Sequence, residues 1–220
     1  MPDIHRSDTR ERLLDAATEV FAERGYEAAT VREICRRAQA NVAAVNYYFG
    51  DKKQLYAAIF DRVFELVGKH RVPFLHRDAP PAARLRVFLQ SLFGQLFCRD
   101  EDTETCLRVG AMYLMEMARP TDVLDRMVAE HISRDAEEIH SIVTALLGAG
   151  ADPETVTDTV ASVAGQVLFY YHVQPIFQRL FPDLPPPEQR IDRLVDHIWH
   201  FSLGGVERVR SRTTGSGSST

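Results

Sequence analysis

The sequence predicts an all-α fold, with a small N-terminal helical domain followed by a larger C-terminal helical bundle. Apolar residues recur three or four positions apart along most of the chain, which is the spacing of one helix face, and we find no convincing strand pattern. The proline-rich stretch VPFLHRDAPP at 72–81 interrupts this pattern and favours a connection. We therefore expect domains at 8–68 and 78–210, and a flexible tail without core residues at 211–220.

The first two helices of the N-terminal domain can be placed by their end signals. The first covers RERLLDAATEVFAERG after Asp8, and Gly25 is a suitable stop because glycine readily adopts the positive φ of a helix end. The second begins at Val31, since Thr30 and Glu33 have the spacing of a capping box.

A third, short helix completes this three-helix domain. Asn41 is a good N-cap, and the helix ends near Phe49, where Gly50 and Asp51 lead into a further helix at 52–69. Two helices joined by a turn of about three residues form a helix-turn-helix, the motif whose second helix enters the DNA major groove. The same arrangement also occurs in helical bundles that never bind DNA. The side chains of the helix pair are therefore needed to distinguish a DNA-binding motif from a structural one.

The composition of the third helix suits close approach to base edges. Val42, Ala43 and Ala44 are small and uncharged, so the backbone can come near the bases and the methyl groups can contact thymine. Asn46 lies four positions after Val42, on the same face, where its amide can pair with adenine. These features favour DNA binding over a purely structural helix pair.

Groups that suit phosphates surround this helix. Tyr47 and Tyr48 offer phenolic hydrogen bonds to bases or phosphates. The alternative is that both rings are half-buried and only support the helix. The helix start at Lys52 and Lys53 combines free N–H groups with positive charge. Further cationic reach is expected from Arg32, Arg36 and Arg37.

The stretch TVREICRRAQANVAAVNYYFGDKKQLYAAIF at 30–60 resembles the DNA-binding domain of the TetR family of bacterial transcriptional regulators, and the resemblance covers about residues 8–68. The DNA-contacting residues that it implies are Thr30, Arg32, Asn41, Val42, Ala43, Ala44, Asn46, Tyr47, Tyr48 and Lys52. This sequence departs from the family at Gln39-Ala40, where glycine-valine is usual, and at Asn46, where tyrosine is common. Residues 41–47 also look like the subclass with a CecR-like C-terminal domain.

The resemblance implies a C-terminal helical bundle that dimerises and binds a small-molecule effector. The helix from Thr155 and the last helix carry apolar residues at helical spacing, and small residues in the first of them permit close packing. Two such helices from each subunit would form a four-helix interface around a two-fold axis. The residues expected there are Val160, Val163, Val167, Leu194, Ile198 and Trp199, with the core of one subunit as the alternative for each.

An effector pocket is expected among the aromatic and methionine side chains of the middle helices. The candidates are Phe93, Phe97, Met112, Tyr113, Met117, Phe169 and Tyr170. Most such stripes are helix core, which is the alternative for each residue. His197 and His200 lie three positions apart on the last helix, but no carboxylate or cysteine partner stands at a fixed spacing. We expect no metal site and no cofactor.

The wider composition narrows the class of function. Residues 1–77 hold 13 Lys or Arg against 11 Asp or Glu, whereas residues 78–220 hold 13 against 20, which fits a polyanion partner for the first part only. No membrane-spanning run or secretory signal is present, so a cytoplasmic protein is expected. Catalytic motifs such as GxSxG, HExxH and the P-loop are missing, which argues against an all-helical enzyme. A helical interaction module without DNA would leave the chemistry of residues 46–53 unused.

We expect a ligand-responsive, homodimeric repressor that binds a palindromic operator in double-stranded DNA and has no membrane partner. Two recognition helices about one DNA turn apart read more bases than a single helix can. An effector that prefers a conformation with wrongly spaced recognition helices would release the DNA. The helix at 52–69 is the expected lever, because it begins at the phosphate and runs into the bundle.

Overall fold

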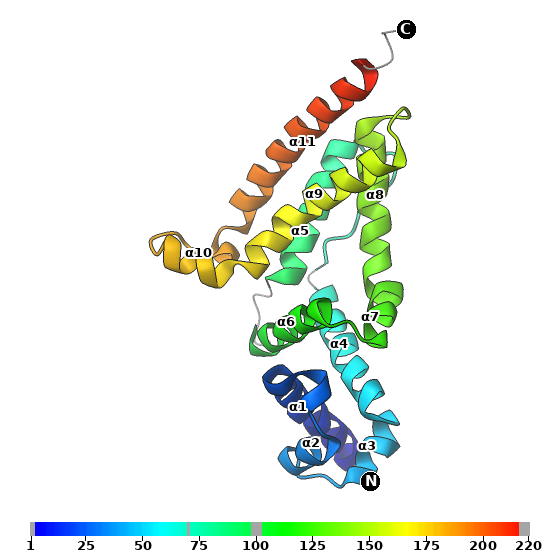
Figure 1. Cartoon of the computed structure of the whole chain (residues 1–220), viewed down its shortest axis with the longest axis vertical. Coiled ribbons are helices and arrows are strands. Elements are labelled where there is room, and N and C mark those ends of the chain that lie inside the picture. The colour runs from blue at the N-terminus through cyan, green and yellow to red at the C-terminus, as the bar shows by residue number, and fades with distance from the viewer. Residues whose placement is uncertain (1–2, 70, 98–102, 216–220) are drawn as a thin grey trace. The chain divides into compact units, whose positions relative to one another are not determined.

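The computed structural model describes the backbone of residues 3–69, 71–97 and 103–215, and the side chains of 8–69, 71–97 and 108–212. Every regular element within these ranges is a helix, which confirms the predicted all-α class (Figure 1). None of the described helices combines the length and the apolar content that a membrane crossing requires.

The chain folds into two compact units, which we call the N-terminal unit and the C-terminal unit. The first contains Met1–Leu66 and Asp100–Ile132, and the second contains Val67–Arg99 and Ser133–Thr220. This division differs from the expected domains at 8–68 and 78–210, because the middle segment packs with the N-terminal helices. Val109, Met112, Val123 and Met127 lie in the same apolar core as the first helices.

The N-terminal unit is built from six α-helices and a short π-helix among the described residues. They are α1 (Asp3–Ala28), α2 (Val31–Arg37), α3 (Val42–Phe49), most of α4 (Lys52–Gly68), α6 (Thr103–Ala118), α7 (Asp122–Met127) and η1 (Val128–Ile132). Gly25 has φ 72° and ψ 172°, so the regular part of α1 ends there, as predicted. α1 packs against both α2 and α6, and Leu13, Phe21, Ile34 and Leu55 are fully buried in the shared core.

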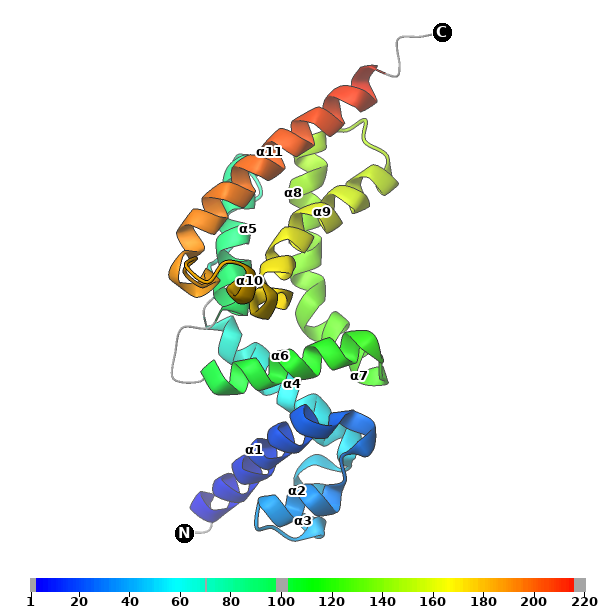
Figure 2. The same cartoon turned by 60° about the vertical axis from the view of Figure 1, so that its left-hand side comes forward.

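The C-terminal unit is a bundle of longer helices. It contains α5 (Pro81–Leu96), α8 (Ser133–Leu147), α9 (Pro153–His172), α10 (Gln174–Leu180), a 3₁₀ turn η2 (Pro187–Gln189) and α11 (Ile191–Gly215). α11 packs against α5, α8 and α9, and these helices run side by side in Figure 2. The core between them includes Leu89, Phe93, Ile142, Val167 and Val195. α10 and the loop after it extend outward from this bundle (Figure 1).

Candidate nucleic-acid interface

The start of α2 is fixed by the capping interaction that the sequence predicts. The backbone N–H of Glu33 donates to Oγ1 of Thr30 at 3.2 Å, which satisfies one of the free donors of the first turn. Ile34 and Cys35 then face the core and hold α2 against α1. Thr30 and Arg32 remain exposed, as a contact with an external partner requires.

The turn between α2 and α3 passes through a left-handed backbone conformation. Gln39 has φ 50°, and within the described residues it is the one non-glycine residue with positive φ. Side chains with a Cβ are strained in this region by about 1–2 kcal/mol. The N–H of Ala40 donates to the carbonyl of Cys35 at 2.9 Å, and the Cys35 thiol lies 3.7 Å from the carbonyl oxygen of Asn41. The turn therefore keeps its shape despite the lack of glycine at this position.

α3 is anchored on one side and open on the other. The N–H of Ala43 donates to Oδ1 of Asn41 at 3.0 Å, which confirms the predicted N-cap. Val45 is fully buried, whereas Val42 is 44% exposed and Tyr47 is 65% exposed. Asn46 lies on the exposed side as well. The helix thus presents small apolar groups, an amide and a phenol outward, with no charged residue of its own.

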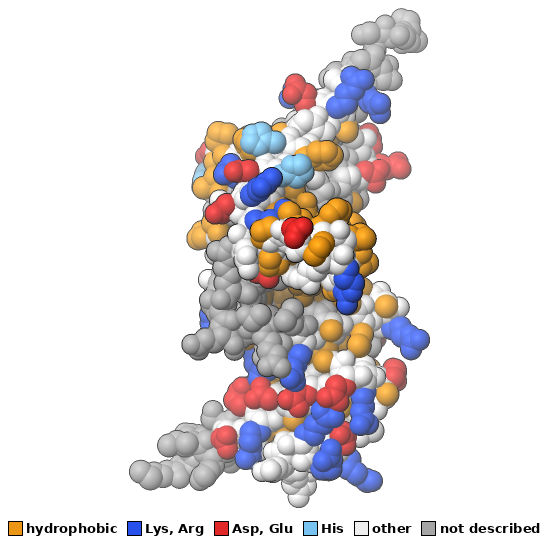
Figure 3. All heavy atoms as spheres, turned by 90° about the vertical axis from the view of Figure 1, so that its left-hand side faces the viewer, with side chains coloured by type: hydrophobic (Ala, Val, Ile, Leu, Met, Phe, Trp, Pro, Cys, Tyr) orange, Lys and Arg blue, Asp and Glu red, His pale blue; other side chains and the backbone are white. Residues whose placement is uncertain are grey.

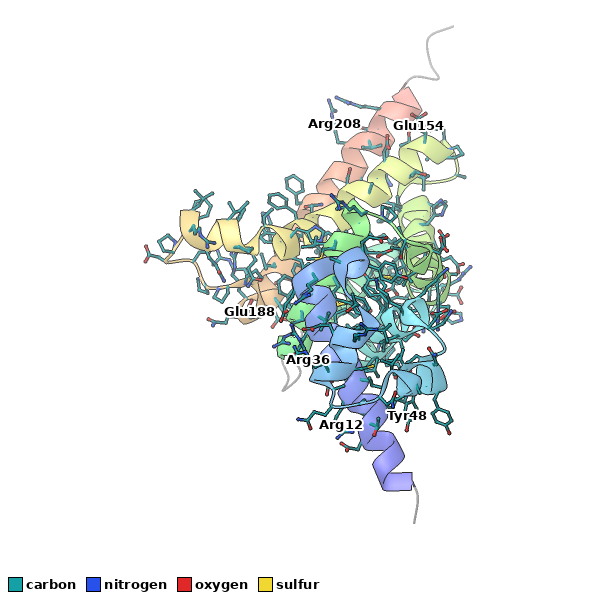
Figure 4. The ribbon with its side chains drawn as sticks, turned by 60° about the horizontal axis from the view of Figure 1, so that its bottom comes forward. Arg12, Arg36, Tyr48, Glu154, Glu188 and Arg208 are labelled. Atoms are coloured by element: carbon teal, nitrogen blue, oxygen red, sulfur yellow. The ribbon has the colours of Figure 1, made fainter. Side chains whose placement is uncertain are left out.

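The aromatic residues at the end of α3 pack against one another. The rings of Tyr47 and Tyr48 meet edge to face at 4.9 Å, and the guanidinium of Arg10 lies 5.4 Å from the Phe49 ring centroid. Tyr48 is half-buried, so it supports the helix while its hydroxyl end stays near the surface. Figure 4 shows Tyr48, Arg12 and Arg36 extending outward from α3, α1 and α2.

The start of α4 directly follows α3 and carries two lysines. Asp51 accepts a 2.8 Å hydrogen bond from the N–H of Gln54 and so caps the helix. Lys52 lies 4.5 Å from the Tyr26 ring centroid and donates to the carbonyl of Glu27 at 3.4 Å. Lys53 instead pairs with Asp122, with 2.5 Å between Nζ and Oδ2. The two adjacent cations therefore have different partners within the chain.

Arg37 does not provide the cationic reach expected from the sequence. Its guanidinium lies 2.6 Å from Oε2 of Glu23 and 3.2 Å from Oε1 of Glu33, so it joins α2 to α1. Arg36 is largely exposed, although it also binds Glu33 at 3.0 Å. The hydrogen bonds from Arg36 and Arg37 lower the pKa of Glu33 to about 2. The expectation for Arg37 is therefore corrected, because two carboxylates already hold its charge.

The residues expected to form an effector pocket divide between the two units. Met112, Tyr113 and Met117 belong to the N-terminal unit, where Met112 is fully buried. Phe93, Phe97, Phe169 and Tyr170 belong to the C-terminal unit, where the rings of Phe93 and Phe97 stack at 5.7 Å. Tyr170 lines a hollow beside α10, together with Phe177, Phe181 and Arg190. The four residues of the C-terminal unit stay candidates for a pocket.

The residues expected at a dimer interface need a correction. Val163, Val167, Leu194 and Ile198 are buried within a single subunit, so their side chains cannot meet a partner. Trp199 is half-buried and its Nε1–H donates to the carbonyl of Ala82 at 2.7 Å, while Val160 packs at the edge of the same core. Helical spacing shows which residues share a face, but it does not show whether that face meets another helix of the same chain.

Other apolar side chains of these helices are exposed. Phe169 on α9 and Phe201 on α11 face outward, and Phe201 is 66% exposed. Figure 3 shows hydrophobic side chains gathered over α10 and the loop after it, where Ile176, Leu180, Phe181 and Leu184 are exposed. Large apolar side chains that are exposed together on one surface are typical of protein contact surfaces.

One cluster of potential ligand groups was not found by sequence reasoning. Asp61, Glu130 and His131 offer ligand atoms within 4.8 Å of one another, and the last two residues lie in the π-helix η1. Arg126 already binds Asp61 at 2.8 Å and Glu130 at 3.1 Å, so its guanidinium compensates both carboxylates. The positions are about 70 residues apart in sequence, and no local pattern connects them.

Two family models match the chain. Residues 13–59 match the model described as bacterial regulatory proteins, tetR family. Residues 81–206 match the model described as HTH-type transcriptional dual regulator CecR, C-terminal domain. The second match covers more than half of the chain, and the first contains α2 and α3.

Individual proteins show the same likeness. The HTH-type transcriptional repressor Rv3405c of Mycobacterium tuberculosis is 37% identical over 75 residues, which cover 34% of this chain and 38% of that protein. The HTH-type transcriptional activator FasR of Mycolicibacterium smegmatis is 28% identical over 158 residues, covering 68% of this chain and 72% of that protein. The chain thus spans 38% of the length of the first curated relatives that it matches.

A solved structure shares the fold. NalD, the secondary repressor of the MexAB-OprM multidrug efflux pump in Pseudomonas aeruginosa, aligns with a TM-score of 0.55 and 19% identity. The alignment covers 88% of this chain and 96% of that chain.

Proposed function

Because the chain belongs to the TetR family of bacterial regulatory proteins and has a C-terminal domain of the CecR type, we propose that it is a DNA-binding transcriptional regulator. It acts as a homodimer on a palindromic operator, and it represses transcription until a small molecule releases it. A regulator of this kind would work in the cytoplasm, where bacterial DNA lies.

The observation that supports this proposal is the geometry of α3. Its N-cap Asn41 and its buried anchor Val45 fix the helix, while Val42, Asn46 and Tyr47 stay exposed along the other side. A recognition helix needs this combination, since it must be rigid and yet approach base edges closely.

The exposed side chains can be assigned to different kinds of DNA contact. Val42 and Ala43 would touch thymine methyl groups, and the amide of Asn46 would pair with an adenine edge. Tyr47 would reach a neighbouring base. The residues assigned to positioning on the sugar-phosphate backbone are Thr30, Arg32, Tyr48 and Lys52.

The C-terminal unit would supply dimerisation and effector binding. The exposed apolar residue Phe201 marks the part of α11 that could meet a second subunit. An effector that binds one spacing of the two recognition helices better than the other would shift the balance between bound and free operator. The effector itself would be an apolar or aromatic small molecule, because the residues proposed for its pocket include the aromatic side chains of Phe93, Phe97 and Tyr170.

Selection of bound sequences from random DNA tests the proposal, followed by titration of the selected operator in a gel-shift assay. We expect a palindromic sequence and a dimer-sized complex with steep salt dependence. Recovery of no preferred sequence, together with no retardation at low salt, would refute DNA-binding regulation and favour an interaction module.

Two substitutions separate the roles of the side chains. Lys52→Ala should weaken binding to all sequences alike and lower the salt slope by about one unit per subunit. Asn46→Ala should relax the preference at one base pair of each half-site, with a loss of about 1–3 kcal/mol in discrimination. Lys69→Ala is the matched control, since it removes the same charge from an exposed residue that directly follows the C-terminal end of α4.

A further inference from the structure

Lys53 is the second cation at the start of α4, and its charge is already bound within the chain. Its Nζ lies 2.5 Å from Oδ2 of Asp122, although the two residues are 69 positions apart. The hydrogen bond with Lys53 lowers the pKa of Asp122, and the same bond raises the pKa of Lys53. Both groups therefore remain charged across the neutral range.

The backbone just before Asp122 is fixed by hydrogen bonds to a buried side chain. It is the first residue of α7, directly after the N-cap Thr121. The N–H and hydroxyl of Thr121 donate to Oε1 of Glu116 at 2.6 and 2.8 Å. Glu116 is almost fully buried, so the turn that carries Asp122 is fixed from inside the N-terminal unit.

The other end of this network lies on the helix that carries Lys53. The hydroxyl of Tyr56 donates to Oε2 of Glu116 at 3.1 Å. Lys53 and Tyr56 are three positions apart on α4 and therefore share a helix face. Tyr56 binds the last turn of α6 and Lys53 binds the first residue of α7, so the same face of α4 contacts both sides of the connection that carries Asp122.

The pair is nevertheless open to solvent and to a polyanion. The side chain of Lys53 is 44% exposed and that of Asp122 is 80% exposed. An exposed ion pair contributes little to stability, so a DNA phosphate can replace the carboxylate at small cost. Lys53 directly follows Lys52, the residue to which the proposed function assigns a phosphate.

We propose that Asp122 competes with a DNA phosphate for Lys53 and so limits the affinity of the protein for its operator. Lys53 is then a conditional phosphate ligand: it is neutralised by Asp122 in the free protein and available to DNA when the pair opens. The proposal rests on the proposed DNA binding and deepens it, since it assigns a regulatory role to a residue outside the helix-turn-helix.

Neutralisation of Asp122 tests the inference, with Asp125→Asn as the matched control. Asp125 lies on the same helix, is exposed and gives the same change of net charge. On the selected operator, Asp122→Asn should bind roughly fivefold more tightly as a dimer than the wild type. Its salt slope should be steeper by up to about 0.9 per subunit, because Lys53 then contacts a phosphate in every complex and not only in those in which the ion pair has opened. Asp125→Asn should show only a small change in both quantities.

Lys53→Gln in both backgrounds completes the experiment. In the Asp122→Asn background it should abolish the gain in affinity and in salt slope, whereas in the wild type it should have little effect. Melting temperatures of all variants check that the fold is kept, which the exposure of both side chains favours.

The outcomes separate the two proposals. If the wild type binds its operator and Asp122→Asn behaves like Asp125→Asn, or binds more weakly, the competition is refuted while the regulator stands. If the wild type binds no preferred DNA, the proposed function fails and the competition fails with it.

Discussion

The hydroxyl of Tyr56 donates a hydrogen bond to a carboxylate oxygen of Glu116, 60 positions away, and both side chains are almost completely enclosed, with exposures of 2% and 1%. This bond joins α4 to the last turn of α6. Burial, followed by the nearby Glu116 charge, raises the pKa of Tyr56, so the phenol stays protonated and acts as the donor. A charged acceptor in a buried position makes the bond stronger than an average one.

Removal of this bond should destabilise the N-terminal unit measurably. Tyr56→Phe should cost about 2 kcal/mol of unfolding free energy, because a hydrogen bond to a charged group is lost. Glu116→Ala should cost about 3 kcal/mol or more, since it also leaves a cavity and removes the acceptor of Thr121. Urea unfolding measures both, and the double variant should lose less than the sum. Additive losses would show that the two side chains do not act together.

Strain at Gln39 predicts a stabilising substitution. The residue is exposed and has φ 50°, a conformation that glycine adopts without steric cost. Gln39→Gly should therefore raise the unfolding free energy by about 1 kcal/mol, as measured by chemical or thermal unfolding. A loss of stability would mean that the side chain of Gln39 makes a contact worth more than the strain.

Gly50 provides the converse case at the end of α3. It has φ 88°, and a Cβ added there would meet no atom within 4 Å. Gly50→Ala should therefore lower the unfolding free energy by about 1–2 kcal/mol through backbone strain alone. An unchanged melting curve would contradict this assignment. Gly68→Ala, where a Cβ also has free space and φ is not positive, is the control.

The loss of folding stability at acidic pH should depend on Glu33. Its pKa is lowered from 4.5 to about 2 by hydrogen bonds from Arg36 and Arg37, so its charged form stabilises the fold. The contribution is complete above pH 4.5 and is lost as the pH falls through the folded pKa near 2. Glu33→Gln should be less stable than the wild type at pH 6, and the difference should shrink toward pH 2. If the unfolding free energies of the variant and the wild type differed by the same amount at every pH, Glu33 would not have this role.

Self-association and folding should respond to different residues of α11. Phe201 is exposed and Ile198 is buried, although they lie on the same helix. Phe201→Ser should weaken the dimer in sedimentation experiments with little effect on the fold of the subunit. Ile198→Ala should lower the unfolding free energy by about 3 kcal/mol, since it leaves a cavity in the core. A dimer unaffected by Phe201→Ser would place the partner surface elsewhere.

Local signals were sufficient for much of the fold and for part of the interface. Thr30, Asn41 and Gly25 act within four residues of their own positions, so the C-terminal end of α1 and the starts of α2 and α3 could be predicted from the sequence, whereas α1 begins at Asp3 and not after Asp8. The exposed side of α3 follows from its single buried anchor, Val45.

Interactions between distant positions could not be predicted in the same way. The Arg37–Glu23, Lys53–Asp122 and Tyr56–Glu116 contacts join residues 14, 69 and 60 positions apart. Periodicity reveals that Val163 and Val167 share an apolar face, but the face meets α11 and its neighbours in the same chain. The same limit explains why α6 was expected with the C-terminal bundle and instead packs against α1.

The absence of charge on α3 has a consequence for how recognition responds to ionic strength. Counterions are displaced where cations meet phosphates, and in the proposed complex those cations belong to other helices. The rank order of operator variants should therefore stay the same from dilute to concentrated buffer, even as every complex becomes weaker.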